Sequence, residues 1–80
     1  MNDSVLNFPI VLRRLREARN WSQERLAEHA NLNRSYLGEV ERGSAIPSLS
    51  TASKLACALE IPLSLLIAQC ESIASREQGG

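Results

Sequence analysis

The sequence predicts an all-helical domain. Apolar residues recur at spacings of three and four along the chain, as they do on one face of an α-helix, and no segment shows the strict alternation of a β-strand. The apolar residues are mostly Leu, Ala, Ile and Val, with only Phe8, Trp21 and Tyr36 as aromatics, which suits closely packed helices. A chain of 80 residues is enough for one domain, 1–80, with an expected core at about 8–75.

Residues that commonly begin and end helices divide the chain into five predicted helices. Asn20 and Gly43 tolerate the left-handed backbone that ends many helices, while Ser22 and Asn33 are good N-caps. The predicted ranges are about Phe8–Arg19, Gln23–His29 and Arg34–Glu41, then a fourth helix capped by Ser48 or Ser50 and a fifth that starts near Leu63.

The same spacing predicts which residues face the core. The expected inward residues are Val11, Leu12, Leu15 and Ala18, then Leu26, Ala27 and Ala30, then Leu37 and Val40, and then Ala52, Leu55, Ala56 and Leu59. In the fifth helix, Leu63, Leu66, Ile67 and Cys70 lie on one stripe. Leu32 stands alone between two Asn residues, and we expect it to fill the core from within the turn.

Composition and charge exclude several classes of protein. The net charge is zero, which counts against a strongly basic nucleic-acid-binding domain. The segment from Arg13 to Arg42 carries seven Arg against five Glu, so any affinity for nucleic acid must come from a few placed contacts. No apolar run approaches the roughly 18 residues of a membrane span, and the N-terminus lacks the basic start of a signal peptide. Cys57 and Cys70 have no metal-ligand spacing, so we expect reduced thiols in a cytoplasmic protein without a metal.

Catalysis is not expected. The chain has no Ser-His-Asp or Cys-His set, no carboxylate pair in an apolar setting, and no Gly-rich loop that could cradle a phosphate. We therefore predict neither catalytic residues nor a cofactor.

The third predicted helix has an unusual polar surface. Its apolar residues are Leu37 and Val40, and the remaining positions are too polar for a buried helix. A merely solvated helix would favour Lys, Glu and Ala over Ser, Tyr and Gly. Gly38 costs about 1 kcal/mol relative to Ala in mid-helix, and close approach of a bulky partner, such as DNA, is one explanation.

A set of short motifs resembles the Cro and phage-repressor type (Xre-like) helix-turn-helix family. They are Leu12-Arg13, Leu15-Arg16, Ser22-Gln23, Leu26-Ala27, Glu41-Arg42-Gly43, Pro47-Ser48-Leu49 and Leu55-Ala56. The resemblance covers about residues 12–67 and is most like restriction–modification controller proteins. It implies a five-helix lambda-repressor-like fold in which the second and third helices bind double-stranded DNA, with the third entering the major groove.

The resemblance and the helical spacing agree on which side of the third helix faces DNA. Arg34, Ser35 and Glu39 lie opposite Leu37 and Val40, and we expect them to contact bases, with Arg34 suited to guanine. Two roles stay open for Glu39, which either accepts from a cytosine amino group or repels phosphate and sets the register.

Contacts with the DNA backbone are expected from residues around the two helices. The candidates are Gln23, which matches a phosphate-binding position of the family, together with Asn33, Tyr36, Arg42 and Ser44. For Tyr36, half-buried support of the turn is an equal alternative. The resemblance also implies a structural ion pair between Arg16 and Glu41, partly buried between the first and third helices.

Departures from the family pattern point to a dimer interface. Cys57 and Leu65 stand where charged residues are more usual, and exposed apolar surface often marks an interface. We expect a homodimer through the fifth helix, using Leu63, Leu65, Ile67, Ala68 and Ile73, unless Leu65 packs internally. Glu60 replaces a usual Gly and Pro62 a capping Ser, so we expect a strained or differently shaped chain between the last two helices.

The predicted function is sequence-specific transcriptional regulation on a palindromic operator. An antitoxin or phage-type repressor of the same fold, or a protein-interaction adaptor, are the alternatives. RNA polymerase is a further candidate partner, because Glu24 and Glu28 match the acidic outer face of the second helix in activators of this family, although such residues also serve as a solvated face.

Overall fold

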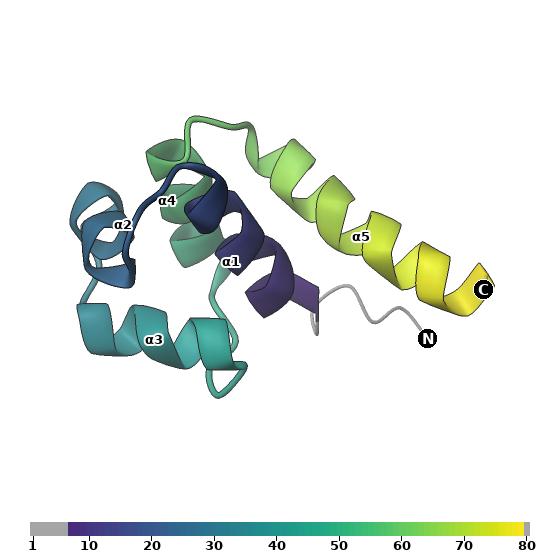
Figure 1. The fold of residues 1–80 in the computed structure, drawn as a ribbon, viewed down its shortest axis with the longest axis horizontal. Helices are drawn as coiled ribbons and strands as arrows, with labels where there is room; N and C mark the ends of the chain where they lie inside the picture. The colour runs from purple at the N-terminus through teal and green to yellow at the C-terminus, as the bar shows by residue number, and fades with distance from the viewer. Residues whose placement is uncertain (1–6, 80) are drawn as a thin grey trace.

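The computed structural model describes residues 7–79, and their side chains as far as Ser72, as an arrangement of five α-helices (Figure 1). The helices are α1 (Phe8–Ala18), α2 (Gln23–Ala30), α3 (Arg34–Arg42), α4 (Leu49–Ala58) and α5 (Leu63–Gly79). The predicted all-helical fold is confirmed, and the bounds of the first three helices agree with the prediction to within one residue.

Side-chain caps begin three of the helices. Ser22, Asn33 and Ser48 each accept hydrogen bonds from backbone N–H groups two or three residues later, at 2.8–3.2 Å. These bonds satisfy donors that the first turn of a helix leaves unpaired. Ser48, and not Ser50, is thus the cap of α4, while Pro62 supplies only its carbonyl oxygen to the first turn of α5.

Residues with a left-handed backbone conformation follow the ends of several helices. Asn20, Asn31 and Gly43 have φ angles of 59°, 56° and 79°, which Asn and Gly tolerate. Glu60 also has a φ of 59°, so the position that usually holds Gly keeps its backbone shape despite a side chain. The Glu60 carboxylate accepts a hydrogen bond of 2.6 Å from Arg19, which links the ends of α1 and α4.

One hydrophobic core lies among the five helices. Its buried members are Phe8, Val11, Leu12, Leu26, Ala27, Ala30, Leu37, Val40, Ala52, Leu55, Ala56, Leu59, Leu66 and Cys70. Leu32 is half-buried and packs against this core from its turn, as expected. One prediction for the inward residues was wrong: Ala18 is exposed, because it is the last residue of α1. Ile67, which the sequence also assigns to a dimer interface, is 37% exposed.

The helix contacts leave one face of the α2–α3 unit uncovered. In Figure 1, α2 and α3 lie together at one end of the molecule, and the second half of α5 extends away from the other helices. α1 packs against α3 and α5, α2 packs against α3 and α4, and α4 packs against α5. No single helix of residues 7–79 is both long and apolar enough to cross a membrane.

An aromatic stack supports the outer side of α2. The Trp21 and His29 rings lie nearly parallel, with centroids 4.3 Å apart, and the Arg19 guanidinium lies 4.6 Å from the centroid of the Trp21 ring. His29 is exposed, as expected, and gains this contact because it lies on the side of α2 that faces the preceding loop.

We predict that Glu60→Gly stabilises the protein. A left-handed backbone costs a residue with a Cβ about 1–2 kcal/mol, and the exposed pair with Arg19 returns at most about 1 kcal/mol, so unfolding should require about 0.5–1 kcal/mol more. Urea denaturation measures this free energy. Asn31→Gly is the matched control and should change it less, because Asn tolerates this conformation. A loss of stability in Glu60→Gly would mean that the Arg19 pair outweighs the backbone strain.

Candidate nucleic-acid interface

The orientation of α3 agrees with the sequence prediction. Leu37 and Val40 are fully buried against the core, together with Glu41, and Arg34, Ser35, Glu39 and Arg42 are exposed. The polar side of the helix is therefore free to meet a partner.

A polar hollow of about 260 Å³ lies on this free side, between the start of α2 and α3. It is lined by Gln23, Arg34, Ser35, Gly38, Glu39 and Arg42. The three predicted base-contacting residues and two of the predicted backbone-contacting residues thus come together from two helices. The lining carries two guanidinium groups, of Arg34 and Arg42, and one carboxylate, of Glu39. Its net positive charge favours an anion.

Three other predicted backbone contacts lie outside this hollow. Asn33 and Ser44 are exposed at opposite ends of α3, and the Asn33 side-chain oxygen is used as the helix cap. Tyr36 is half-buried and packs against the core, which favours the supporting role. Their contacts with DNA stay predictions, as does that of Glu24 and Glu28 with RNA polymerase, although both carboxylates are exposed.

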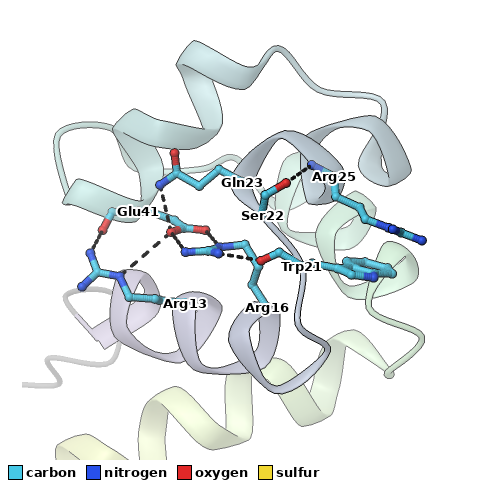
Figure 2. A network of polar contacts seen from close by, with 7 residues as sticks. All are labelled: Arg13, Arg16, Trp21, Ser22, Gln23, Arg25 and Glu41. Carbon is cyan, nitrogen blue, oxygen red and sulfur yellow. Dashed lines mark hydrogen bonds and ion pairs between the residues drawn. The ribbon is translucent and has the colours of Figure 1, made fainter.

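The predicted pair of Arg16 and Glu41 is present and is the centre of a larger network (Figure 2). Glu41 is 1% exposed, and its two carboxylate oxygens accept hydrogen bonds from Arg16 Nε at 2.7 Å and Nη2 at 3.0 Å. Arg16 Nη1 donates to the Trp21 carbonyl oxygen at 2.7 Å. Because both charged groups are paired and hydrogen-bonded, the cost of burying them is offset.

Two further hydrogen bonds to Glu41 were not predicted from the sequence. Gln23 Nε2 donates to Glu41 Oε1 at 3.1 Å, and Arg13 Nη2 donates to the Glu41 backbone carbonyl oxygen at 3.3 Å. Gln23 therefore belongs both to the polar hollow and to the buried network, with one amide N–H left for a ligand. No periodicity could reveal these bonds, because they depend on the angles at which three helices meet.

The network affects the charge state of its arginine. The hydrogen bonds from the Arg16 side chain to Glu41 raise the pKa of the guanidinium above its ordinary value, and burial opposes this effect. Arg16 is therefore a permanent cation, and Glu41 always has a positive partner.

The residues predicted for a dimer interface are only partly exposed. Leu65, Ile67 and Ala68 are exposed, Leu63 is half-buried, and the side chain of Ile73 lies outside the described residues. Among residues 7–72, the most exposed large apolar side chains are Ile46 at 75% and Leu49 at 73%, which were not predicted from the sequence. They precede or begin α4, where no periodic pattern marks them.

An apolar pocket of about 170 Å³ joins Ile46 and Leu49 to α5. Its other lining residues include Phe8, Pro47, Ile67 and Cys70, and none of the lining residues is charged.

Burial raises the pKa of the Cys70 thiol, so this cysteine is a poor nucleophile. Within residues 7–72, no group of three or more His, Cys, Asp or Glu side chains is placed to hold a metal ion.

Comparison with known proteins identifies the family. Residues 12–66 match the family described as Helix-turn-helix. The chain belongs to the helix-turn-helix family. The match runs from within α1 to the first turn of α5, so it contains all of α2, α3 and α4, and the resemblance seen in the sequence is confirmed.

The relatives of this helix-turn-helix chain differ in how much of their own length the match covers. It is 42% identical over 67 residues to the immunity repressor protein of Bacillus phage phi105, a match covering 84% of this chain and 46% of the repressor. It is 36% identical over 72 residues to the control protein C.MunI of Mycoplasma sp, covering 89% and 97%. The chain thus spans about half of the repressor and only 35% of a transcriptional regulator of Escherichia coli that it also matches.

A solved structure shows the same fold. The restriction-modification controller protein C.AhdI from Aeromonas hydrophila is 47% identical, with a TM-score of 0.74 over 82% of this chain and 98% of C.AhdI. At this identity the likeness extends beyond topology, and it supports the expected resemblance to controller proteins.

We predict that Glu41→Gln destabilises the protein by about 3–5 kcal/mol, because Arg16 would keep a partly buried charge without its counterion. Urea denaturation followed by circular dichroism measures the loss. Glu60→Gln is the matched control, since it breaks an exposed pair with Arg19 and should cost less than about 1 kcal/mol. Equal losses in the two variants would contradict the central place of the buried pair.

Proposed function

We propose that this protein is a DNA-binding transcriptional regulator of the restriction–modification controller type, acting as a homodimer on a palindromic operator in the cytoplasm. The observation that carries the proposal is the free polar face of α3, which forms a hollow with the start of α2 in a chain of the helix-turn-helix family. A helix of this kind enters the major groove by its N-terminal end, where Arg34 and Ser35 lie.

The likeness to a solved controller structure favours a controller over a phage repressor. The chain shares the fold of C.AhdI at 47% identity and matches C.MunI over 89% of its residues, whereas it is 42% identical to the phage repressor.

Arg34 is proposed as the main base-reading residue. Its guanidinium is exposed at the first position of α3 and can donate two hydrogen bonds to guanine, while Ser35 and Glu39 lie beside it in the hollow. Gln23 and Arg42 are proposed to hold the DNA backbone, which fixes the register in which Arg34 reads.

We predict that Arg34→Ala relaxes sequence preference at one base pair of each half-site, a loss of about 1–3 kcal/mol of discrimination. Selection of bound sequences from random duplex DNA, carried out with both proteins, measures the change. Arg14→Ala is the control, since Arg14 is exposed on α1 and does not line the hollow. An unchanged preference in Arg34→Ala would contradict its proposed role, and failure of the native protein to enrich any sequence would overturn the function itself.

The apolar pocket is proposed as the contact between two copies of the chain. Its rim carries Ile46, Leu49 and Ile67, which are exposed in the single copy, and a lining without charges suits burial against an identical surface. The segment that carries Ile46 directly follows α3, the proposed recognition helix of each copy. Two such helices would meet successive major grooves about 34 Å apart.

We predict that Leu49→Glu weakens dimerisation at least about tenfold, because burial of a leucine side chain is lost in each copy and a charge is introduced. Sedimentation equilibrium measures the association constant. Ile10→Glu is the matched control: Ile10 is also an exposed apolar residue in the first turn of a helix, but it does not line the pocket. A monomeric native protein, or equal effects of the two substitutions, would contradict the proposed interface.

A further inference from the structure

Gly38 occupies a position that no backbone requirement explains. It lies in the middle of α3, where Gly costs about 1 kcal/mol relative to Ala. Within residues 7–79, the only glycine with a positive φ is Gly43, so the backbone at Gly38 is one that any residue adopts. The reason for a glycine here must therefore be the space that a side chain would fill.

The space beside Gly38 is filled by the protein's own Arg42. A Cβ placed on Gly38 would lie 3.1 Å from Arg42 Nη1, closer than ordinary van der Waals contact, and 3.7 Å from Gln23 Oε1. Arg42 follows Gly38 by four residues, and helical side chains lean toward the N-terminus, so the Arg42 side chain lies back over Gly38. The sequence-based explanation, that Gly38 makes room for DNA, is therefore incomplete.

The two side chains that meet at Gly38 have different degrees of freedom. Gln23 is held from behind, since its Nε2 donates to the buried Glu41 carboxylate at 3.1 Å. Arg42 is exposed, and within the described residues it has no ion-pair partner, so its guanidinium, which lies over Gly38, is free to move. A methyl group at position 38 would displace this guanidinium, whereas Gln23 Oε1, at 3.7 Å, would be at ordinary van der Waals distance.

We propose that Gly38 is a positioning residue, which seats the Arg42 guanidinium beside Gln23 so that the two side chains together hold one phosphate of the DNA backbone. This proposal rests on the proposed DNA-binding function and adds a residue to it. Glu39 lines the same hollow, so the anion lies toward Gln23 and Arg42, away from that carboxylate. The donors to the phosphate oxygens are the Arg42 guanidinium and the N–H of Gln23 Nε2 that Glu41 leaves unused, since Gln23 Oε1, the atom nearest Gly38, is an acceptor.

The test is a double-mutant cycle made of the native protein, Gly38→Ala, Arg42→Ala and the double variant. Binding to a fluorescein-labelled duplex of mixed sequence is followed by anisotropy at several NaCl concentrations, because phosphate contacts set the slope of affinity against salt. Thermal unfolding of each protein is measured in parallel. Since Ala is the better helix former and the end of Arg42 is free to move, Gly38→Ala should be at least as stable as the native protein.

The expected result is that Gly38→Ala weakens binding roughly three- to tenfold, as for the loss of about one hydrogen bond, and lowers the salt slope toward that of Arg42→Ala. In the Arg42→Ala background the same substitution should have no effect. Equal weakening in both backgrounds would show that the methyl group added by Gly38→Ala collides with DNA directly and would overturn the proposal. Unchanged affinity in Gly38→Ala would overturn it as well.

The same experiment separates this inference from the function on which it rests. Salt-dependent binding of the native protein without an effect of Gly38→Ala leaves DNA binding in place and removes only the role of Gly38. A native protein that binds no duplex at any salt concentration overturns both.

Discussion

The buried carboxylate of Glu41 is the constraint on which the arrangement of the first three helices depends. It is paired by two hydrogen bonds with Arg16 of α1 and by one with Gln23 of α2, while Glu41 itself belongs to α3. A buried charge tolerates little movement, because any rotation of α3 would leave it without its partners. Leu37 and Val40 fill the core from the same helix, so the packing and the ion pair fix the same orientation.

The same constraint reaches the polar face of α3 through Gln23. The buried network and the surface hollow share Gln23, whose amide donates to the buried Glu41 carboxylate and also lines the hollow. Binding residues gain precision when side chains behind them restrict their movement, because less conformational entropy is lost on binding. The hollow is therefore built partly in advance, with Gln23 fixed by Glu41 and the Arg42 guanidinium lying over Gly38.

Much of the fold could be predicted from the sequence because its helix boundaries carry local chemical signals. Ser22 and Asn33 cap helices, and Asn20 and Gly43 end them, each through a property of its own side chain or backbone. The outward face of α3 followed from helical spacing. The pair of Arg16 and Glu41 did not follow from spacing and was available only through resemblance to a family.

The features that escaped prediction depend on tertiary geometry. Ile46 lies in a loop and Leu49 begins a helix, where exposure is set by what packs nearby and not by a repeat. The bond from Gln23 to Glu41 joins residues 18 positions apart and requires the observed crossing of α2 and α3. Even the contact of Gly38 with Arg42, although local, requires the rotamer of a long side chain that the sequence leaves open.

The central claim is that the face of α3 opposite Leu37 and Val40 meets DNA. Backbone amide chemical shifts, recorded by NMR while duplex DNA is added, test it most directly. The account predicts that the largest changes occur at residues 22–24 and 33–44, with smaller changes along α4. Changes centred on α4 and α5, with the amides of α3 unmoved, would contradict it.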